Sequence, residues 1–163
     1  MTITAGAHHE FFVTGSPVSV NRYGTAAYKN WRGDVHAESV RGGAWSGCLV
    51  STPCSVHIRY FQHLDARKDV DNILKAILDG LDGKAVKGPK LPMRVIHDDR
   101  DVERVISQRT KIGFTTRISS RSLTVQEYAA ALAALSAQAA VFVSVGAAPN
   151  HSRSVLRCTR RLS

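Results

Sequence analysis

Residues 69–83, DVDNILKAILDGLDG, constrain the fold more than any other segment of the sequence. Their apolar side chains recur at the spacing of one helical face, as i, i+1, i+4, i+5 and i+8. These positions are Ile73, Leu74, Ile77, Leu78 and Leu81. Asp71 or Asn72 is a natural N-cap, and Gly83 is a natural stop. The spacing therefore predicts an amphipathic helix over this segment.

Strand-like segments flank this helix on both sides. Residues 54–62 alternate, with Val56 and Ile58 on one face and His57 on the other, and residues 101–114 alternate in the same way. Further strands are predicted over residues 10–18 and 141–145, and further helices over residues 25–41 and from the Thr124–Glu127 capping box to about Gln138. The predicted fold class is α/β, a mixed sheet with packed helices.

The length of 163 residues favours one domain. We expect residues 1–114 to form its core and residues 115–148 to add an Ala-rich helix and a final strand. Residues 149–163 are expected to form a basic, flexible tail. Residues 128–148 carry no charge, but ten of these 21 residues are Ala. We therefore favour a helix followed by a strand over a membrane span.

The cysteines and the first residues indicate a reduced setting. Three cysteines without a CxxC pair exclude a disulfide scaffold and a four-cysteine zinc site. The first twelve residues contain no Lys or Arg and no apolar stretch of the length found in a secretory signal. We therefore expect a cytoplasmic protein.

The charge is positive but unevenly placed. Lys and Arg number 22 against 13 Asp and Glu, which gives a net charge of +9. A basic protein suggests a polyanionic partner, most simply nucleic acid. Nine of the 13 acids nevertheless lie within residues 64–105. Metal binding in front of a phosphate backbone would explain this concentration, and a solvated charged face is the alternative.

Five residues in this acidic stretch could form one site. Asp69 and Asp71 are two residues apart and would face the same way in an extended approach to the helix. Lys75 follows Asp71 by four residues, one helical turn later. Asp98 and Asp99 precede the strand predicted over residues 101–114. If that strand lies beside the 54–62 strand, the second acidic pair meets the first.

Such a cluster points to divalent-metal chemistry. Carboxylates packed together repel unless a cation joins them, and Mg²⁺ or Mn²⁺ prefers such oxygen ligands. The ion could activate a water and stabilise charge on a phosphodiester, while Lys75 stabilises the transition state or orients the nucleophile. The simpler alternatives are that Asp71 is an N-cap, that Asp98 and Asp99 form a turn, and that Lys75 is an exposed helix charge.

The same residues resemble the RusA family of Holliday junction resolvases. Residues 17–23, PVSVNRY, are similar to the family's P-x-S-x-N-R-Y. Residues 67–76, RKDVDNILKA, are similar to basic-D-x-D-N-L-x-K-A, and residues 98–102, DDRDV, to D-D-x-x-V. The three motifs occur in the family's order and span about residues 10–114, or roughly two-thirds of the chain.

The resemblance implies a small α/β nuclease that acts as a homodimer. Family members make paired nicks across four-way DNA junctions by Mg²⁺-dependent hydrolysis. Carried over by motif, the catalytic metal ligands are Asp69, Asp71 and Asp99, the further candidate ligand is Asp98, and the catalytic lysine is Lys75. The positions that match DNA-contacting groups are Asn21, Arg22, Arg67 and Lys68.

Two departures from the family pattern and two rival functions stay open. The loop at residues 83–96 is longer and richer in Lys and Pro than in compact members, and residues 115–163 match no part of the pattern. One rival is a non-catalytic nucleic-acid-binding protein with structural acids, whose binding would depend on salt but not on divalent ions. The other is a metal nuclease that acts on other branched or linear DNA.

Overall fold

The computed structural model describes residues 8–41, 50, 53–63, 71–84, 94–113, 115, 117 and 121–148, apart from the side chain of Asp71. The strands are β1 (His9–Thr14), β2 (Cys54–His63), β3 (Val102–Ile112) and β4 (Ala139–Ala147). The α-helices are α1 (Ala26–Ser39), α2 (Asp71–Leu81) and α3 (Val125–Ala137). Two single 3-10 turns are η1 (Val20–Arg22) and η2 (Asp99–Asp101). The predicted fold class is confirmed, and the tail over residues 149–163 lies outside the described residues.

The four strands form one mixed sheet in the order β1-β4-β2-β3. β4 is antiparallel to both of its neighbours, whereas β2 and β3 are parallel. The final strand predicted over residues 141–145 therefore lies inside the sheet and is longer than predicted. The predicted neighbours, the 54–62 and 101–114 strands, are also adjacent, as β2 and β3.

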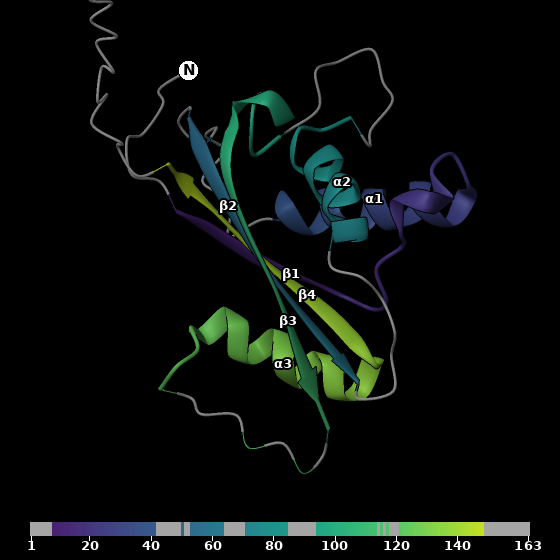
Figure 1. Ribbon diagram of the computed structural model, residues 1–163, viewed down its shortest axis with the longest axis vertical. Coiled ribbons are helices and arrows are strands. Elements are labelled where there is room, and N and C mark those ends of the chain that lie inside the picture. The colour runs from purple at the N-terminus through teal and green to yellow at the C-terminus, as the bar shows by residue number, and fades with distance from the viewer. Residues whose placement is uncertain are drawn as a thin grey trace, which may run out of the picture.

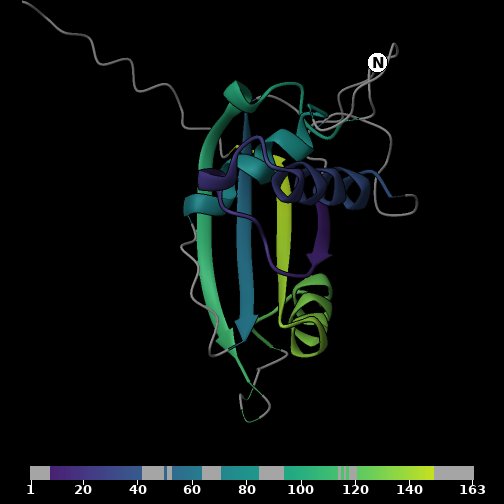
Figure 2. The same ribbon diagram turned by 90° about the vertical axis from the view of Figure 1, so that its right-hand side faces the viewer.

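Helices pack on both faces of this sheet (Figures 1 and 2). α1 and α2 lie toward one end of the strands, and α3 lies toward the other end (Figure 1). Val56, Ile58 and Tyr60 of β2 join the core beneath α1 and α2, whereas Phe61 joins the core beneath α3. This division follows from the two-residue period of a strand, which sends successive side chains to opposite faces.

The predicted apolar face of α2 is the face that packs. Ile73, Ile77 and Leu81 are fully buried, and Leu74 and Leu78 pack against the same core while partly exposed. The stripe therefore turns the opposite side of α2 away from the core. That side carries the polar residues of the candidate site.

The uncharged segment over residues 128–148 is divided between α3 and β4, as predicted. α3 begins with the predicted capping box, in which Thr124 and Glu127 bond each other's backbone N–H groups. It ends at Gln138, whose left-handed φ of 66° lets β4 start at the next residue. Among the described residues, no helix is long and apolar enough to span a membrane.

The contact between α1 and α2 depends on a missing side chain at Gly80. A Cβ there would lie 2.6 Å from Cγ1 and 2.8 Å from Cβ of Val35, which is completely buried. We expect Gly80→Ala to lower the free energy of unfolding by about 1–3 kcal/mol, because the helices must separate. Urea unfolding followed by circular dichroism measures this change.

Gly33→Ala in α1 is the matched control. A Cβ at Gly33 meets no atom within 4 Å, so the substitution only improves helix propensity. We expect it to raise the free energy of unfolding by about 0.5–1 kcal/mol. Equal effects of the two substitutions would show that the helices do not pack closely at Gly80.

Candidate functional site

The three sequence motifs meet around α2. η1 holds part of the first motif, α2 part of the second, and η2 part of the third. α2 contacts both η1 and η2. η2 leads directly into β3, so the parallel pairing of β2 with β3 helps to fix its position beside the helix. The described parts of the second and third motifs are therefore adjacent, whereas the predicted meeting of Asp98 and Asp99 with Asp69 and Asp71 lies outside the described residues.

Lys75 and Asp99, two of the predicted site residues, are in direct contact. Lys75 Nζ lies 2.9 Å from Asp99 Oδ2 and donates a hydrogen bond to it. The residues are 24 positions apart and come from separate motifs. Lys75 is therefore more than an isolated exposed charge on the helix.

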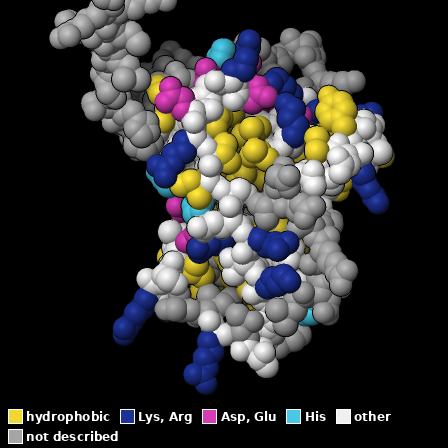
Figure 3. Space-filling view, in the orientation of Figure 1, with side chains coloured by type: hydrophobic (Ala, Val, Ile, Leu, Met, Phe, Trp, Pro, Cys, Tyr) yellow, Lys and Arg dark blue, Asp and Glu magenta, His cyan; other side chains and the backbone are white. Residues whose placement is uncertain are grey.

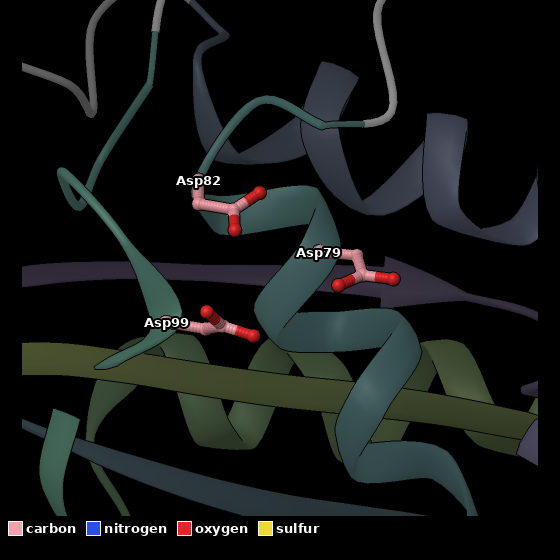
Figure 4. A group of neighbouring side chains, drawn as sticks. All are labelled: Asp79, Asp82 and Asp99. Carbon is pink, nitrogen blue, oxygen red and sulfur yellow. The ribbon is translucent and has the colours of Figure 1, made fainter. Parts of the chain in front are cut away.

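Two further carboxylates, Asp79 and Asp82, complete the group with Asp99. One oxygen from each of the three lies within 4.8 Å of the others. Figure 4 shows the three carboxylates around one small space between the end of α2 and η2. Sequence reasoning missed both residues. Asp79 had a signal, because it follows Lys75 by four residues and so lies on the same face of the helix.

In the part of the chain that the structure describes, three cations contact these carboxylates. Lys75 Nζ also lies 2.7 Å from Asp79 Oδ1, and Arg32 Nη1 of α1 lies 3.7 Å from Asp79 Oδ2. Lys84 Nζ lies 2.6 Å from Asp82 Oδ2 and 3.1 Å from Asp99 Oδ1. Asp99 therefore accepts a different lysine at each of its two oxygens.

The pKa values follow from these contacts and from burial. Hydrogen bonds from Lys75 and Lys84 hold the pKa of Asp99 below its usual value. The pKa of Lys84 is raised, chiefly by its hydrogen bond to Asp82, and that of Lys75 is raised chiefly by Asp79. Burial raises the pKa of Asp82 despite its contacts with Lys84. Both lysines therefore stay protonated at neutral pH.

The donor set fits a hard divalent cation. Carboxylate oxygens are preferred ligands of Mg²⁺ and Mn²⁺. One oxygen from each of the three acids lies within 4.8 Å of the others, and opposite ligands of a bound Mg²⁺ are about 4.2 Å apart. Asp99, with 22% of its side chain exposed, is the most accessible of the three, since Asp79 and Asp82 are almost completely buried. Asp99 is therefore the acid that an ion from solvent would reach first.

Asp98 lies outside this group of carboxylates. Its Oδ1 accepts hydrogen bonds from the backbone N–H and the Nε of Arg100, at 3.0 and 2.9 Å, and it caps η2. These hydrogen bonds lower the pKa of Asp98. In the structure, Asp98 thus caps the turn that presents Asp99, and its predicted role as a further metal ligand stays a prediction.

The remaining predicted residues divide into two sets. Asn21 and Arg22 are exposed in η1, which contacts α2. The other predicted residues, Asp69, Arg67 and Lys68, and the side chain of Asp71 lie outside the described residues. Their predicted roles stay predictions.

The surface around the site carries charges of both signs. In Figure 3, Asp and Glu side chains gather mainly near the upper end, where α2 and η2 lie in Figure 1. Lys and Arg side chains are spread from that end to the lower end of the same face. Acids are therefore concentrated on an otherwise basic face.

A separate hollow of about 660 Å³ lies on the side of the sheet that α3 partly covers. It contains a Ser–His–Glu group, in which Ser144 Oγ is 2.8 Å and Glu10 Oε1 is 3.7 Å from His8 Nε2. A catalytic triad requires the hydroxyl and the acid to contact opposite ring nitrogens. Because both closest contacts involve Nε2, this group does not have the arrangement of a serine hydrolase.

Comparison with known proteins adds no relative to these observations. No family model matches the chain, and no curated protein matches it. The assignment to a family therefore stays a prediction from the three motifs.

Proposed function

We propose that this protein is a Mg²⁺-dependent endodeoxyribonuclease that resolves four-way DNA junctions, as its resemblance to the RusA family implies. The observation that carries the proposal is the 2.9 Å contact between Lys75 and Asp99. These residues match the catalytic lysine and a metal ligand of the family, and they lie beside two further carboxylates. Binding alone would gain nothing from acids gathered where phosphate must approach.

The site has the groups that phosphodiester hydrolysis needs. Asp99 is the acid through which the ion would be held, with Asp69 and Asp71 as predicted further ligands. The ion, when bound, would supply a Lewis acid that activates the attacking water and offsets charge on the phosphate. Lys75, whose ammonium group is fixed by Asp79, would stabilise the negative charge that develops in the transition state.

The substrate class follows from charge and symmetry. A net charge of +9 favours a polyanion, and Asn21 and Arg22 are exposed in η1, which contacts α2. Resolution of a junction needs two cuts related by a two-fold axis, so we propose a homodimer with one site in each subunit. Such an enzyme would act in the cytoplasm, and the buried thiol of Cys54, which forms no disulfide, fits a reducing compartment.

Cleavage of a synthetic four-way junction and of a linear duplex of the same sequence tests this function. We expect paired nicks in the junction with Mg²⁺ or Mn²⁺, and none when the ion is removed with a chelator. Equal cleavage of the linear duplex would instead favour a nuclease without junction specificity. Tight junction binding without cleavage in either ion would favour the non-catalytic alternative.

A further inference from the structure

Lys84 repeats the arrangement of Lys75 on the other side of Asp99. Each ammonium group lies between one oxygen of Asp99 and one oxygen of a buried acid at the end of α2. Asp79 holds Lys75 at 2.7 Å, and Asp82 holds Lys84 at 2.6 Å. Lys75 is the only catalytic lysine that the sequence analysis predicts. Lys84 is a second lysine in an equivalent position.

The turn after α2 places Lys84 there. Asp82 Oδ1 accepts a hydrogen bond from the backbone N–H of Lys84 at 2.9 Å, which closes a local turn. Gly83 between them has a φ of 77°, a conformation that other residues adopt only with strain. The turn folds the Lys84 side chain back, so that its ammonium group contacts both Asp82 and Asp99.

The two acids that hold the lysines are buried, whereas the lysines themselves are partly exposed. The side chains of Asp79 and Asp82 are 3% and 1% exposed, whereas those of Lys75 and Lys84 are 44% and 47% exposed. An ammonium group held by a buried carboxylate loses less conformational freedom when it meets a ligand. Both lysines are thus restrained on the protein side and open on the solvent side.

The net charge of this group favours binding of an anion only after a cation has bound. Among the described residues, the three carboxylates are balanced by Lys75, Lys84 and Arg32, so the formal charge of these six groups is zero. A divalent ion at Asp99 would compete for the oxygens that now accept the two lysines. The lysines would keep their contacts with Asp79 and Asp82, and the group would become positive and favour a phosphate.

We propose that Lys84 is a second phosphate-binding lysine, positioned by Asp82 and released from Asp99 when a divalent ion binds. This inference rests on the proposed function and extends it. According to this inference, Lys84 contacts the phosphodiester when the divalent ion is bound and does not contact it when the ion is absent. Lys75 and Lys84 would then approach the phosphate from the two sides of Asp99.

The salt dependence of junction binding by Lys84→Gln tests this role. With Ca²⁺ as the divalent ion, we expect the slope of log K against log salt to become shallower by about 0.9, the value for one lost phosphate contact. In chelator the slope should equal that of the wild type, because Lys84 is then held by Asp82 and Asp99. Cleavage in Mg²⁺ should fall about 10- to 100-fold, as for a lost charge-assisted hydrogen bond.

Matched variants separate this role from general damage to the site. Lys84→Arg keeps the charge and should restore the slope in Ca²⁺. Lys111→Gln removes a lysine near the far end of β3 and should leave cleavage within about twofold of the wild type. Mn²⁺ should bind Lys84→Gln at least as tightly as the wild type, because a competing cation has been removed.

Two results would overturn the inference while the proposed function stands. The first is junction cleavage by Lys84→Gln at the wild-type rate, with an unchanged salt slope in Ca²⁺. The second is a shallower slope in chelator as well as in Ca²⁺, which would mean that Lys84 contacts DNA whether or not the ion is present. Absence of ion-dependent cleavage by the wild type would overturn the proposed function itself, and this inference with it.

Discussion

Asp99→Asn is expected to reduce Mg²⁺-dependent junction cleavage by about 100-fold or more. The substitution removes the most accessible carboxylate charge of the group while keeping the shape of the side chain. Lys75 and Lys84 keep their contacts with Asp79 and Asp82, so we expect the free energy of unfolding to change by less than about 1 kcal/mol. Single-turnover cleavage of labelled junction DNA, together with urea unfolding, measures both effects.

Asp34→Asn is the control for the loss of one negative charge. Asp34 is exposed on α1 and takes no part in the carboxylate group. We expect its cleavage rate to stay within about twofold of the wild type, as is usual for an exposed charge. If the Asp99→Asn variant cleaves the junction as fast as the Asp34→Asn variant, Asp99 has no role in catalysis.

Glu127→Ala is expected to produce the largest loss of stability among the substitutions considered. Glu127 is 6% exposed and pairs with Arg59 of β2 at 3.2 Å, and its other oxygen accepts the N–H of Thr124 at 2.8 Å. Removing the carboxylate breaks the capping box and leaves the largely buried Arg59 without its acid. We expect the free energy of unfolding to fall by about 2–4 kcal/mol.

Urea unfolding measures this loss, and Glu38→Ala supplies the control. Glu38 of α1 pairs at 2.6 Å with Arg41, which lies just beyond the end of the helix and is 70% exposed. Water screens such a pair, so its loss should cost less than about 1 kcal/mol. If the two substitutions shift the urea midpoint equally, the contact between α3 and the sheet does not depend on the Glu127–Arg59 pair.

Local sequence patterns predicted most of the elements of this fold. The stripe from Ile73 to Leu81 predicted α2, alternation predicted β2, and the box at Thr124 predicted the start of α3. Each pattern is a property of residues close together in the chain. The place of β4 between β1 and β2 depends on pairing between distant segments, and no local pattern specifies it.

The sequence predicted only part of the candidate site, because some of its residues are brought together by contacts between distant segments. Lys75 and Asp99 belong to recognisable motifs, and the pairing of β2 with β3 brings them together. Asp79 shares a helical face with Lys75, so its membership could have been inferred from spacing alone. Asp82 and Lys84 join through a turn with a left-handed glycine and a contact to η2, which only the folded chain reveals.

Binding of Mn²⁺ to the wild type and to Asp99→Asn, followed by electron paramagnetic resonance, tests most directly whether this group of carboxylates holds a divalent ion. The signal of free Mn²⁺ reports the fraction bound at each protein concentration, without any need for DNA or cleavage. We expect the wild type to bind Mn²⁺, Mg²⁺ to compete with it, and Asp99→Asn to bind at least about tenfold more weakly. Equal Mn²⁺ binding by the two proteins, or none by the wild type, would contradict a metal centre at Asp99.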